Sequence, residues 1–277
     1  MISPATTIGF IGAGNMAGAL IEGLLSNGIN AACLHASDTS SDKLATLAAK
    51  GVQTTIDNSA VIRACDVVIL AVKPQMMASV LAPLQDALLA KPCLLISVAA
   101  GIQMHSLQQW THQAQPVVRC MPNTPALVLA GASGLYANTL VSAQQKQLAT
   151  DILEAVGLVC WLDAEAQLDA VTALSGSGPA YFFLLMEAMQ AAAIRLGLPA
   201  EVAKSLCLQT AFGAATLALA SDVEVAELRR RVTSPGGTTE AALLQFEADG
   251  FGAMVDRALD KAARRSEALG APATKTK

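Results

Sequence analysis

The chain has 277 residues, and its 18 Lys and Arg against 22 Asp and Glu give a formal net charge of -4. This weakly acidic balance leaves no electrostatic footprint for nucleic acid or for a membrane surface, so we expect small-molecule partners. The N-terminus has no charged segment followed by an apolar core, and no stretch of about 18 uncharged apolar residues is bounded like a membrane span. We therefore predict a cytoplasmic protein, long enough for two domains with their own cores.

The cysteine and histidine patterns do not indicate a metal or redox centre. The six cysteines include no Cys-x-x-Cys pair, and the three histidines show no ligand spacing. We expect the cysteines to be buried as small apolar residues, and we predict no metal site. The chain is 53% hydrophobic but only 4% aromatic, which favours close helix packing and burial between subunits.

Short apolar runs alternate with helical patterns in the first part of the chain. The predicted strands are Thr7–Ile11, Ala32–Ala36, Val67–Ala71, Cys93–Ser97 and Val117–Met121. Ser133–Tyr136 and Val156–Trp161 are expected as edge strands around a helix at Ser142–Ala155. This βαβ order predicts a parallel sheet in an α/β Rossmann-like domain over residues 1–163.

After Asp163 the strand pattern stops and helices follow. They are predicted at Pro179–Leu196, Pro199–Ala220, Val223–Arg231, Thr239–Asp249 and Gly252–Leu269. We expect residues 164–277 to form an all-α domain. The tail Ala271–Lys277 is expected to be disordered.

The first motif with chemical meaning is Gly12-Ala-Gly14-Asn-Met-Ala17, between the first strand and the first helix. Its glycines permit a tight turn and the close approach of a pyrophosphate, whose charge the helix N-terminus attracts. The alternative is a tight βα turn without a ligand. The position at the start of a βαβ series favours a dinucleotide.

Later strand ends carry further candidates. Asp38 stands where an acidic residue binds an adenine ribose, which favours NADH, yet the hydroxyls of Ser37 and Thr39 to Ser41 suit a 2′-phosphate equally well. Asp38 is equally well explained as a turn or cap residue. Lys73 is either a phosphate or ribose partner or a solvated lysine before a proline turn.

Three loops combine small, polar and proline residues. Asn123-Thr124 lies between two prolines, which suits either a rigid turn or a wall of the nicotinamide or substrate site. Ser175–Pro179 interrupts a helical pattern, which marks a close approach of a ligand or of another backbone. Ser234–Thr239 places glycines and hydroxyls before a helix, where free N–H groups can hold a carboxylate; the alternative is a turn that caps the helix.

Five motifs, GFIGAGNM, AVKPQ, MPNTPA, DAVTALSGSGPAY and RVTSPGGTT, occur in this order and spacing. Together they resemble the pyrroline-5-carboxylate reductases, the enzymes of the last step of proline synthesis, and the resemblance runs from Ile8 to Phe251. It implies a Rossmann-like domain and a helical domain through which subunits pair, with the active site between one subunit's nucleotide domain and the helices of the dimer. It further implies NADPH or NADH as cofactor, 1-pyrroline-5-carboxylate as substrate, and a homodimer that can form a higher homo-oligomer such as a decamer.

The resemblance also implies roles for individual residues. For the substrate these are Glu165, Ser234, Gly236, Gly237, Thr238 and Thr239, with Thr239 as the catalytic contact to the ring nitrogen. For the cofactor they are Ile11, Gly12, Ala13, Gly14, Asn15, Met16, Ser37, Asp38, Thr39, Asn58, Ala71, Val72, Lys73, Pro74, Val98, Ala99 and Ala100.

The reaction needs no acid or base beside the substrate, because a protonated imine is already electrophilic. One alternative is a β-hydroxyacid dehydrogenase, which needs a general base. From Leu168 to Ile194 the chain has no lysine or histidine, which argues against it. A dinucleotide-binding protein without catalysis is the other alternative, and the intact carboxylate loop argues against that.

Overall fold

A computed structural model describes residues 2–270 of the chain, so the predicted disorder of Ala271–Lys277 lies outside the described residues. The chain divides into two compact units. The first contains the residues up to Ser177 and those from Ala262 onward, and the second is Gly178–Lys261. The functional boundary predicted after residue 163 stays a prediction; the contacts group the residues between it and Ser177 with the first unit.

The first unit is built on one eight-stranded sheet with the order β3-β2-β1-β4-β5-β6-β7-β8. Its strands are β1 (Ile8–Ile11), β2 (Leu34–Ser37), β3 (Gln53–Thr55), β4 (Val67–Leu70), β5 (Leu94–Ser97), β6 (Val117–Met121), β7 (Gly131–Ala137) and β8 (Gly157–Trp161). Neighbours pair in parallel except at β6 and β7, which are antiparallel. All the predicted strands are present, and the α/β Rossmann-like prediction is confirmed.

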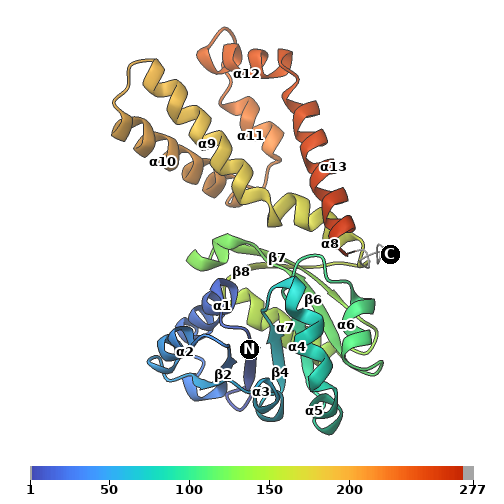
Figure 1. The fold of residues 1–277 in the computed structure, drawn as a ribbon. Coiled ribbons are helices and arrows are strands. Elements are labelled where there is room, and N and C mark those ends of the chain that lie inside the picture. Colours follow the sequence, from blue (N-terminus) through green and yellow to red (C-terminus); the bar gives the residue numbers. More distant parts are fainter. Residues whose placement is uncertain (1, 271–277) are drawn as a thin grey trace. The chain divides into compact units, whose positions relative to one another are not determined.

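Helices cover both faces of this sheet (Figure 1). They are α1 (Asn15–Ser26), α2 (Ser41–Ala48), α3 (Asn58–Ala64), α4 (Met77–Leu81), α5 (Gln85–Ala90), α6 (Met104–Trp110), α7 (Ala143–Glu154) and α8 (Gln167–Val171). Short 3₁₀ turns are η1 (Ala31–Cys33), η2 (Pro74–Met76), η3 (Ala82–Leu84) and η4 (Thr124–Val128), and a π-helical turn, η5 (Thr172–Gly176), follows α8.

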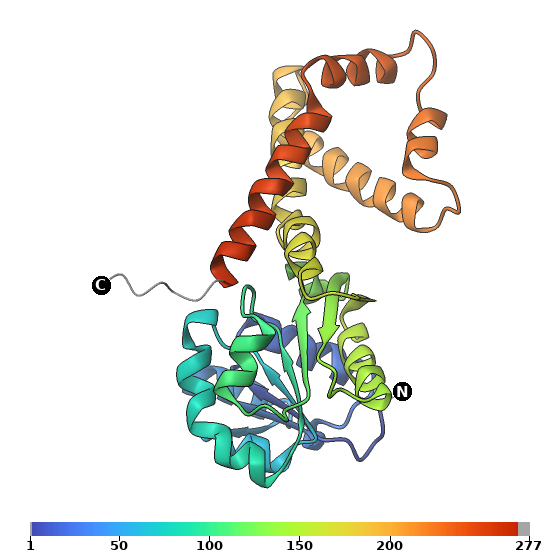
Figure 2. The ribbon, with the colours of Figure 1, turned by 90° about the vertical axis from the view of Figure 1, so that its right-hand side faces the viewer.

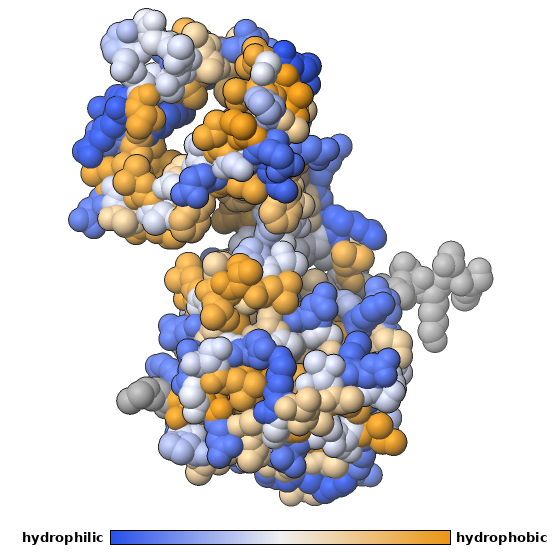
Figure 3. All heavy atoms as spheres, turned by 90° about the vertical axis from the view of Figure 1, so that its left-hand side faces the viewer, coloured by the Kyte–Doolittle hydropathy of each residue, from blue (hydrophilic) through white to orange (hydrophobic). Residues whose placement is uncertain are grey.

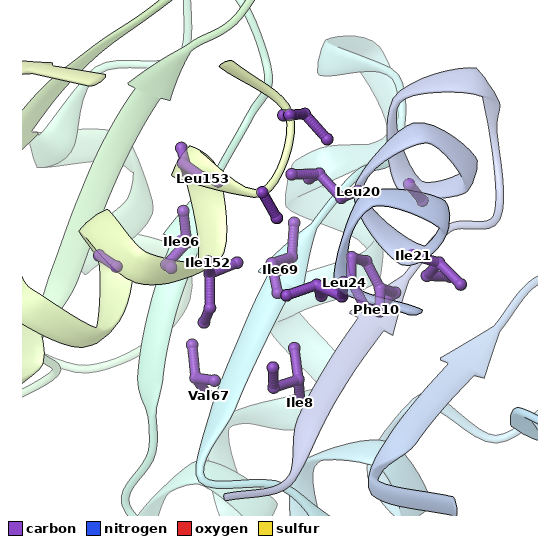
Figure 4. Close-up of a cluster of buried hydrophobic side chains, with 14 of the residues drawn as sticks. Ile8, Phe10, Leu20, Ile21, Leu24, Val67, Ile69, Ile96, Ile152 and Leu153 are labelled. Carbon is purple, nitrogen blue, oxygen red and sulfur yellow. The ribbon is translucent and has the colours of Figure 1, made fainter. Parts of the chain in front are cut away.

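Two apolar cores lie on the two faces of the sheet. On one face Phe10 and Ile69 pack with Leu20 and Leu24 of α1 and with Ile152 of α7 (Figure 4). The other core joins the opposite sides of the same strands to α3, α4, α5 and α6. The strands are therefore buried on both sides, which explains their continuous apolar runs.

The second unit consists of helices. They are α9 (Gly178–Arg195), α10 (Ala200–Leu219), α11 (Val225–Arg231), α12 (Thr238–Ala248) and the first part of α13 (Phe251–Gly270). α9 and α10 pack along each other, and α11 and α12 stand apart from this pair in the ribbon (Figure 2).

These helices bury few of their own side chains. In α10, all of which is described, Ala203 and Cys207 are the buried residues, whereas Leu208 and Phe212 are 45% and 66% exposed. In α9, Phe182 is 63% exposed. Apolar side chains cover much of the surface of the second unit (orange in Figure 3). By length and composition alone α10 is also apolar enough to cross a membrane. A surface of this kind on a helical unit is typical of an interface between subunits.

We predict that Leu208→Glu dissociates the homodimer, because it places a charge in this apolar surface. Sedimentation velocity measures the change in mass. Leu89→Glu is the matched control, because Leu89 is 60% exposed on α5 of the first unit and should leave the dimer intact. If the Leu208→Glu protein stayed dimeric, the surface of α10 at Leu208 would not belong to the interface.

Candidate functional site

The turn between β1 and α1 lies where the strand order reverses, since β2 and β4 flank β1. Gly12 has φ +97°, and a Cβ there would lie 2.7 Å from the carbonyl oxygen of Ala71. The N–H of Gly12 donates to the carbonyl of Ser37 at 2.8 Å. Gly12 is therefore required by the turn itself, which packs tightly against the ends of β2 and β4.

Gly14, unlike Gly12, lies beside open space. It is the N-cap of α1 with φ -79°, and no described side chain caps this helix end. A Cβ on Gly14 would meet no described atom within 4 Å. The first N–H groups of α1 thus face open space, as the approach of a pyrophosphate requires.

The Asp38 carboxylate ties the glycine turn to the end of β2. Its Oδ2 accepts the N–H of Ala13 at 2.7 Å, and its Oδ1 accepts the N–H of Ser40 at 2.9 Å. The Lys43 ammonium lies 3.4 Å from Oδ2. Burial raises the pKa of Asp38, but these donors outweigh it and hold the pKa below its usual value. Asp38 therefore has the turn or cap role in the structure. The Lys43 ammonium compensates the negative charge of its carboxylate.

The other predicted cofactor residues gather at the same edge of the sheet. The Ser37 hydroxyl donates to Oδ1 of Asn58 at 2.7 Å. The backbone N–H of Ala71 bonds Ile11, and that of Val98 bonds Leu70. The segments that complete the set are Ala13–Met16 after β1, Thr39 after β2, Val72–Pro74 after β4 and Ala99–Ala100 after β5. The carboxyl ends of β3, β2, β1, β4 and β5 thus bring the predicted cofactor residues to one edge of the sheet.

A hollow of about 660 Å³ opens beside the glycine turn. It is bordered by Ala13–Asn15, by Lys43 of α2, by Lys50, which follows α2, and by η4. Both lysines are ion-paired: Lys43, which is half exposed, lies 3.4 Å from Oδ2 of Asp38, and Lys50 pairs with Glu22. Lys43 is therefore a cation within reach of a ligand at the turn, and the sequence reasoning did not single it out.

A second cluster surrounds Glu165, which follows β8. Its Oε1 accepts the N–H of Met104 at 2.6 Å and a hydrogen bond from Nη1 of Arg119. Arg119 lies on β6 and is 8% exposed, and it pairs in register with Ser97 of β5. The Ser97 hydroxyl is buried and has no partner among the described residues. An orphaned hydroxyl directly before Val98 fits a strand end that receives a ligand.

The Asn123 loop is held rigidly. The side chain of Asn123 donates to the carbonyl of Ser175 at 3.0 Å and accepts the N–H of Ala132 at 2.9 Å. The carbonyl of Ser175 belongs to η5, and a Cβ on Gly176 would lie 2.4 Å from Cε of Met121. The predicted interruption at Ser175–Pro179 is thus a π-helical turn that allows close packing against the end of β6.

The loop before α12 belongs to the second unit. Ser234 to Gly237 form a turn closed by the N–H of Gly237 to the carbonyl of Ser234 at 3.0 Å, with Gly236 at φ +70°. Proline at the second position and glycine at the third are what a type II turn requires. The N–H of Gly236 donates to Oε2 of Glu240 at 2.7 Å.

This turn leaves the start of α12 uncapped. Gly237 is the N-cap, and no described side chain accepts a hydrogen bond there from the helix. The N–H groups of Thr238, Thr239 and Glu240 are in the first turn, where no intrahelical acceptor is available. These donors and the two threonine hydroxyls suit a carboxylate, and the described residues contain no cluster that could hold a metal ion.

Comparison with known proteins identifies the family. Residues 165–269 match the family described as pyrroline-5-carboxylate reductase dimerisation, and residues 7–101 match NADP oxidoreductase, coenzyme F420-dependent. A pyrroline-5-carboxylate reductase of Pseudomonas aeruginosa is 56% identical over 95% of this chain and 96% of its own. The chain belongs to the pyrroline-5-carboxylate reductase family.

Solved reductases share the fold. That of Coxiella burnetii is 45% identical, covers 96% of this chain and 99% of its own, and has a TM-score of 0.93. That of Plasmodium falciparum, solved with NADP bound, is 31% identical, covers 98% of this chain and 100% of its own, and has a TM-score of 0.86. The predicted fold, family and enzyme class, an NAD(P)H-dependent oxidoreductase, are confirmed, and the matched dimerisation family supports the homodimer.

Sequence reasoning missed Lys43, Arg119 and Ser97. Arg119 had a visible signal, because a charged residue in the apolar strand Val117–Met121 calls for a partner. Lys43 is in the first turn of α2, but its pairing with Asp38 depends on the loop between them. The orphaned hydroxyl of Ser97 can be recognised only in the structure.

We predict that Gly14→Ala weakens dinucleotide binding by about tenfold or more, because the added Cβ enters the space in front of the α1 N-terminus. Folding should be little affected, since φ at Gly14 is one that alanine adopts. NADPH fluorescence titration and a thermal melt measure the two effects. Gly18→Ala is the control: it also meets open space within α1 and should keep wild-type binding. Unchanged affinity in Gly14→Ala would place the pyrophosphate elsewhere.

Proposed function

We propose that the protein reduces the C=N bond of 1-pyrroline-5-carboxylate to give L-proline, the last step of proline biosynthesis, with NADPH or NADH as the hydride donor. Membership of the reductase family over nearly the whole chain carries this function. The two uncapped helix starts, at Gly14 and Gly237, support it, because their free N–H groups suit the anionic groups of a dinucleotide and of a carboxylate substrate. An assay of NAD(P)H loss with 1-pyrroline-5-carboxylate and of proline formation tests it.

The substrate carboxylate is proposed to bind at Ser234, Gly236, Gly237, Thr238 and Thr239. The type II turn and the open first turn of α12 support this, because they offer several N–H donors without a formal positive charge. Thr239 is proposed as the catalytic contact, through a hydrogen bond between its hydroxyl and the ring nitrogen. Glu165 is proposed as a further substrate contact, through Oε2, because its hydrogen bonds with the described residues use Oε1.

The cofactor is proposed to bind along the carboxyl edge of the sheet. Gly12–Met16 would hold the pyrophosphate, and Ser37–Thr39 and Asn58 would hold the adenosine. The remaining contacts would come from Ile11, from Ala71–Pro74 and from Val98–Ala100. The open space at Gly14 and the unpartnered hydroxyl of Ser97 fit a ligand at this edge.

The bound nicotinamide supplies a hydride to the imine carbon, the atom that becomes Cδ of proline, while the ring nitrogen keeps the proton of the iminium ion. The protein's task is therefore to hold the substrate by its carboxylate, to orient the ring nitrogen at Thr239 and to exclude water. The absence of lysine and histidine from Leu168 to Ile194 is consistent with this chemistry, because no general base is needed.

We propose that NADPH is preferred over NADH. An NADH-selecting aspartate needs its carboxylate for the ribose hydroxyls, but both oxygens of Asp38 accept backbone N–H groups, and Lys43 compensates the charge. The N-cap of α2, Ser40, makes no side-chain capping bond within the described residues. Lys43 and the hydroxyls of Thr39 to Ser41 thus offer a cation and donors to a 2′-phosphate.

The finer points of assembly and location are proposals too. We propose that the homodimers assemble further into a higher homo-oligomer such as a decamer, which the amount of exposed apolar surface in the second unit supports. A cytoplasmic location, without a membrane or nucleic-acid partner, follows from the same family function and from the weakly acidic charge.

For Thr239→Ala we expect a loss of about 2–4 kcal/mol of transition-state stabilisation. Folding stability should change by no more than about 0.5 kcal/mol, because Thr239 is exposed and does not cap α12 within the described residues. Steady-state kinetics and a thermal melt compare the two losses. Thr239→Ser keeps the hydroxyl and should restore most of the turnover. Equal turnover in Thr239→Ala and the wild type would show that Thr239 has no catalytic role.

For Lys43→Gln we expect kcat/KM for NADPH to fall about tenfold or more, because a charge-assisted hydrogen bond to a phosphate contributes about 1.5–3 kcal/mol. The value for NADH should change little. Lys50→Gln is the matched control, because Lys50 borders the same hollow but pairs with Glu22 of α1 and not with Asp38 after β2. If Lys43→Gln lowers kcat/KM equally for NADPH and for NADH, Lys43 does not bind the 2′-phosphate.

A further inference from the structure

An arginine in the interior of the first unit has no role in the function proposed so far. Arg119 is on β6, between apolar neighbours, and its side chain is 10% exposed. A buried guanidinium is costly unless it is paired. Its hydrogen bond among the described residues goes from Nη1 to Oε1 of Glu165.

The same carboxylate oxygen has a second donor. Oε1 of Glu165 accepts the backbone N–H of Met104 at 2.6 Å. Met104 is the first residue of α6, and its N-cap Gln103 makes no side-chain cap within the described chain. Glu165 therefore serves as the missing cap of α6 from a distant part of the sequence, and Arg119 fixes the carboxylate that does so.

The position of the first residue of α6 fixes one end of the loop between β5 and α6. This loop begins with Val98–Ala100, the proposed cofactor contacts after β5, and turns at Gly101 with φ +74°. One end is fixed by the sheet, since Ser97 pairs in register with Arg119. The other end is fixed at Met104 by Glu165. Arg119 thus lies beside the start of the loop and, through Glu165, also holds its end.

We infer that Arg119 is a positioning residue of the reductase: it holds Glu165 on the N-terminus of α6 and so fixes the loop from Val98 to Gln103 at the cofactor edge. This inference rests on the proposed function. It concerns the alignment of the cofactor, and Arg119 itself need not touch cofactor or substrate.

The first test compares Arg119→Met with the wild type in two measurements. Hydrogen exchange of the segment 98–106 should become faster, and kcat with NADPH should fall about 10- to 100-fold, because displacements of about 1 Å have such effects on turnover. Arg63→Met is the matched control, since Arg63 forms an arginine–carboxylate pair with Asp57 on the surface of the same unit. It should change neither measurement.

Each outcome decides the inference. Wild-type kcat in Arg119→Met would overturn it, and so would a fall in kcat without faster exchange in segment 98–106, because the loop would then not be the link. If Arg119→Met does not fold, Arg119→Lys carries the same comparison, with a smaller expected loss because one N–H donor is kept. A wild-type protein that forms no proline would refute the proposed function, and the exchange measurement would still report whether Arg119 fixes the loop.

A double-mutant cycle tests the route through Glu165. In a Glu165→Ala background, the added Arg119→Met change should lower kcat by less than about a further threefold, because both changes release the same contact. Losses that multiply would show that Arg119 acts independently of Glu165.

Discussion

Both proposed ligand loops depend on a helix N-terminus that the chain leaves uncapped. At α1 the N-cap is Gly14, and at α12 it is Gly237, and within the described residues neither helix start is capped by a side chain. Each is preceded by a glycine with positive φ, Gly12 or Gly236. A serine or aspartate in place of either N-cap glycine would stabilise the helix by only a few tenths of a kcal/mol, but its side chain would use the donors that a ligand needs.

The two loops are also oriented by similar means. A carboxylate of the protein accepts one N–H just before each helix: Asp38 accepts that of Ala13, and Glu240 accepts that of Gly236, both at 2.7 Å. The remaining first-turn donors stay open. The protein thus fixes the direction of each loop with one charged hydrogen bond and recognises anions with backbone groups.

The sequence predicts the fold well because its signals are local. Buried parallel strands appear as apolar runs, and glycine and proline mark the turns, so all the strands but β3 could be placed. β3 is the short polar segment Gln53–Thr55, which has no apolar run and is defined by its pairing with β2. The helices of the second unit were predicted to within a few residues for the same local reasons.

The candidate site was predictable only in part. The glycine turn and the Ser-Pro-Gly-Gly-Thr-Thr loop are contiguous motifs, and their geometry has the expected open donors. Interactions between residues distant in sequence were not predictable. Glu165 and Arg119 are 46 residues apart, and the capping of α6 by Glu165 has no sequence signature. The π-helical turn at Thr172–Gly176 overlaps the predicted interruption at Ser175–Pro179 only at Ser175 and Gly176, and the sequence does not indicate its conformation.

The apolar surface of the second unit links folding to assembly. Helices that bury as little as α10 gain most of their stabilisation from a partner, so the stability of this unit depends on protein concentration. The homodimer therefore belongs to the folded state of this chain.

Hydride transfer itself is the central claim, and isotope transfer tests it most directly. The protein is supplied with 1-pyrroline-5-carboxylate and with NADPH that carries deuterium at C4 of the nicotinamide, on each face in turn, and the product is examined by mass spectrometry. The account predicts that one of the two labelled cofactors gives proline with one deuterium at Cδ and the other gives unlabelled proline. Oxidation of NADPH without label in proline from either cofactor, or no proline at all, would contradict it.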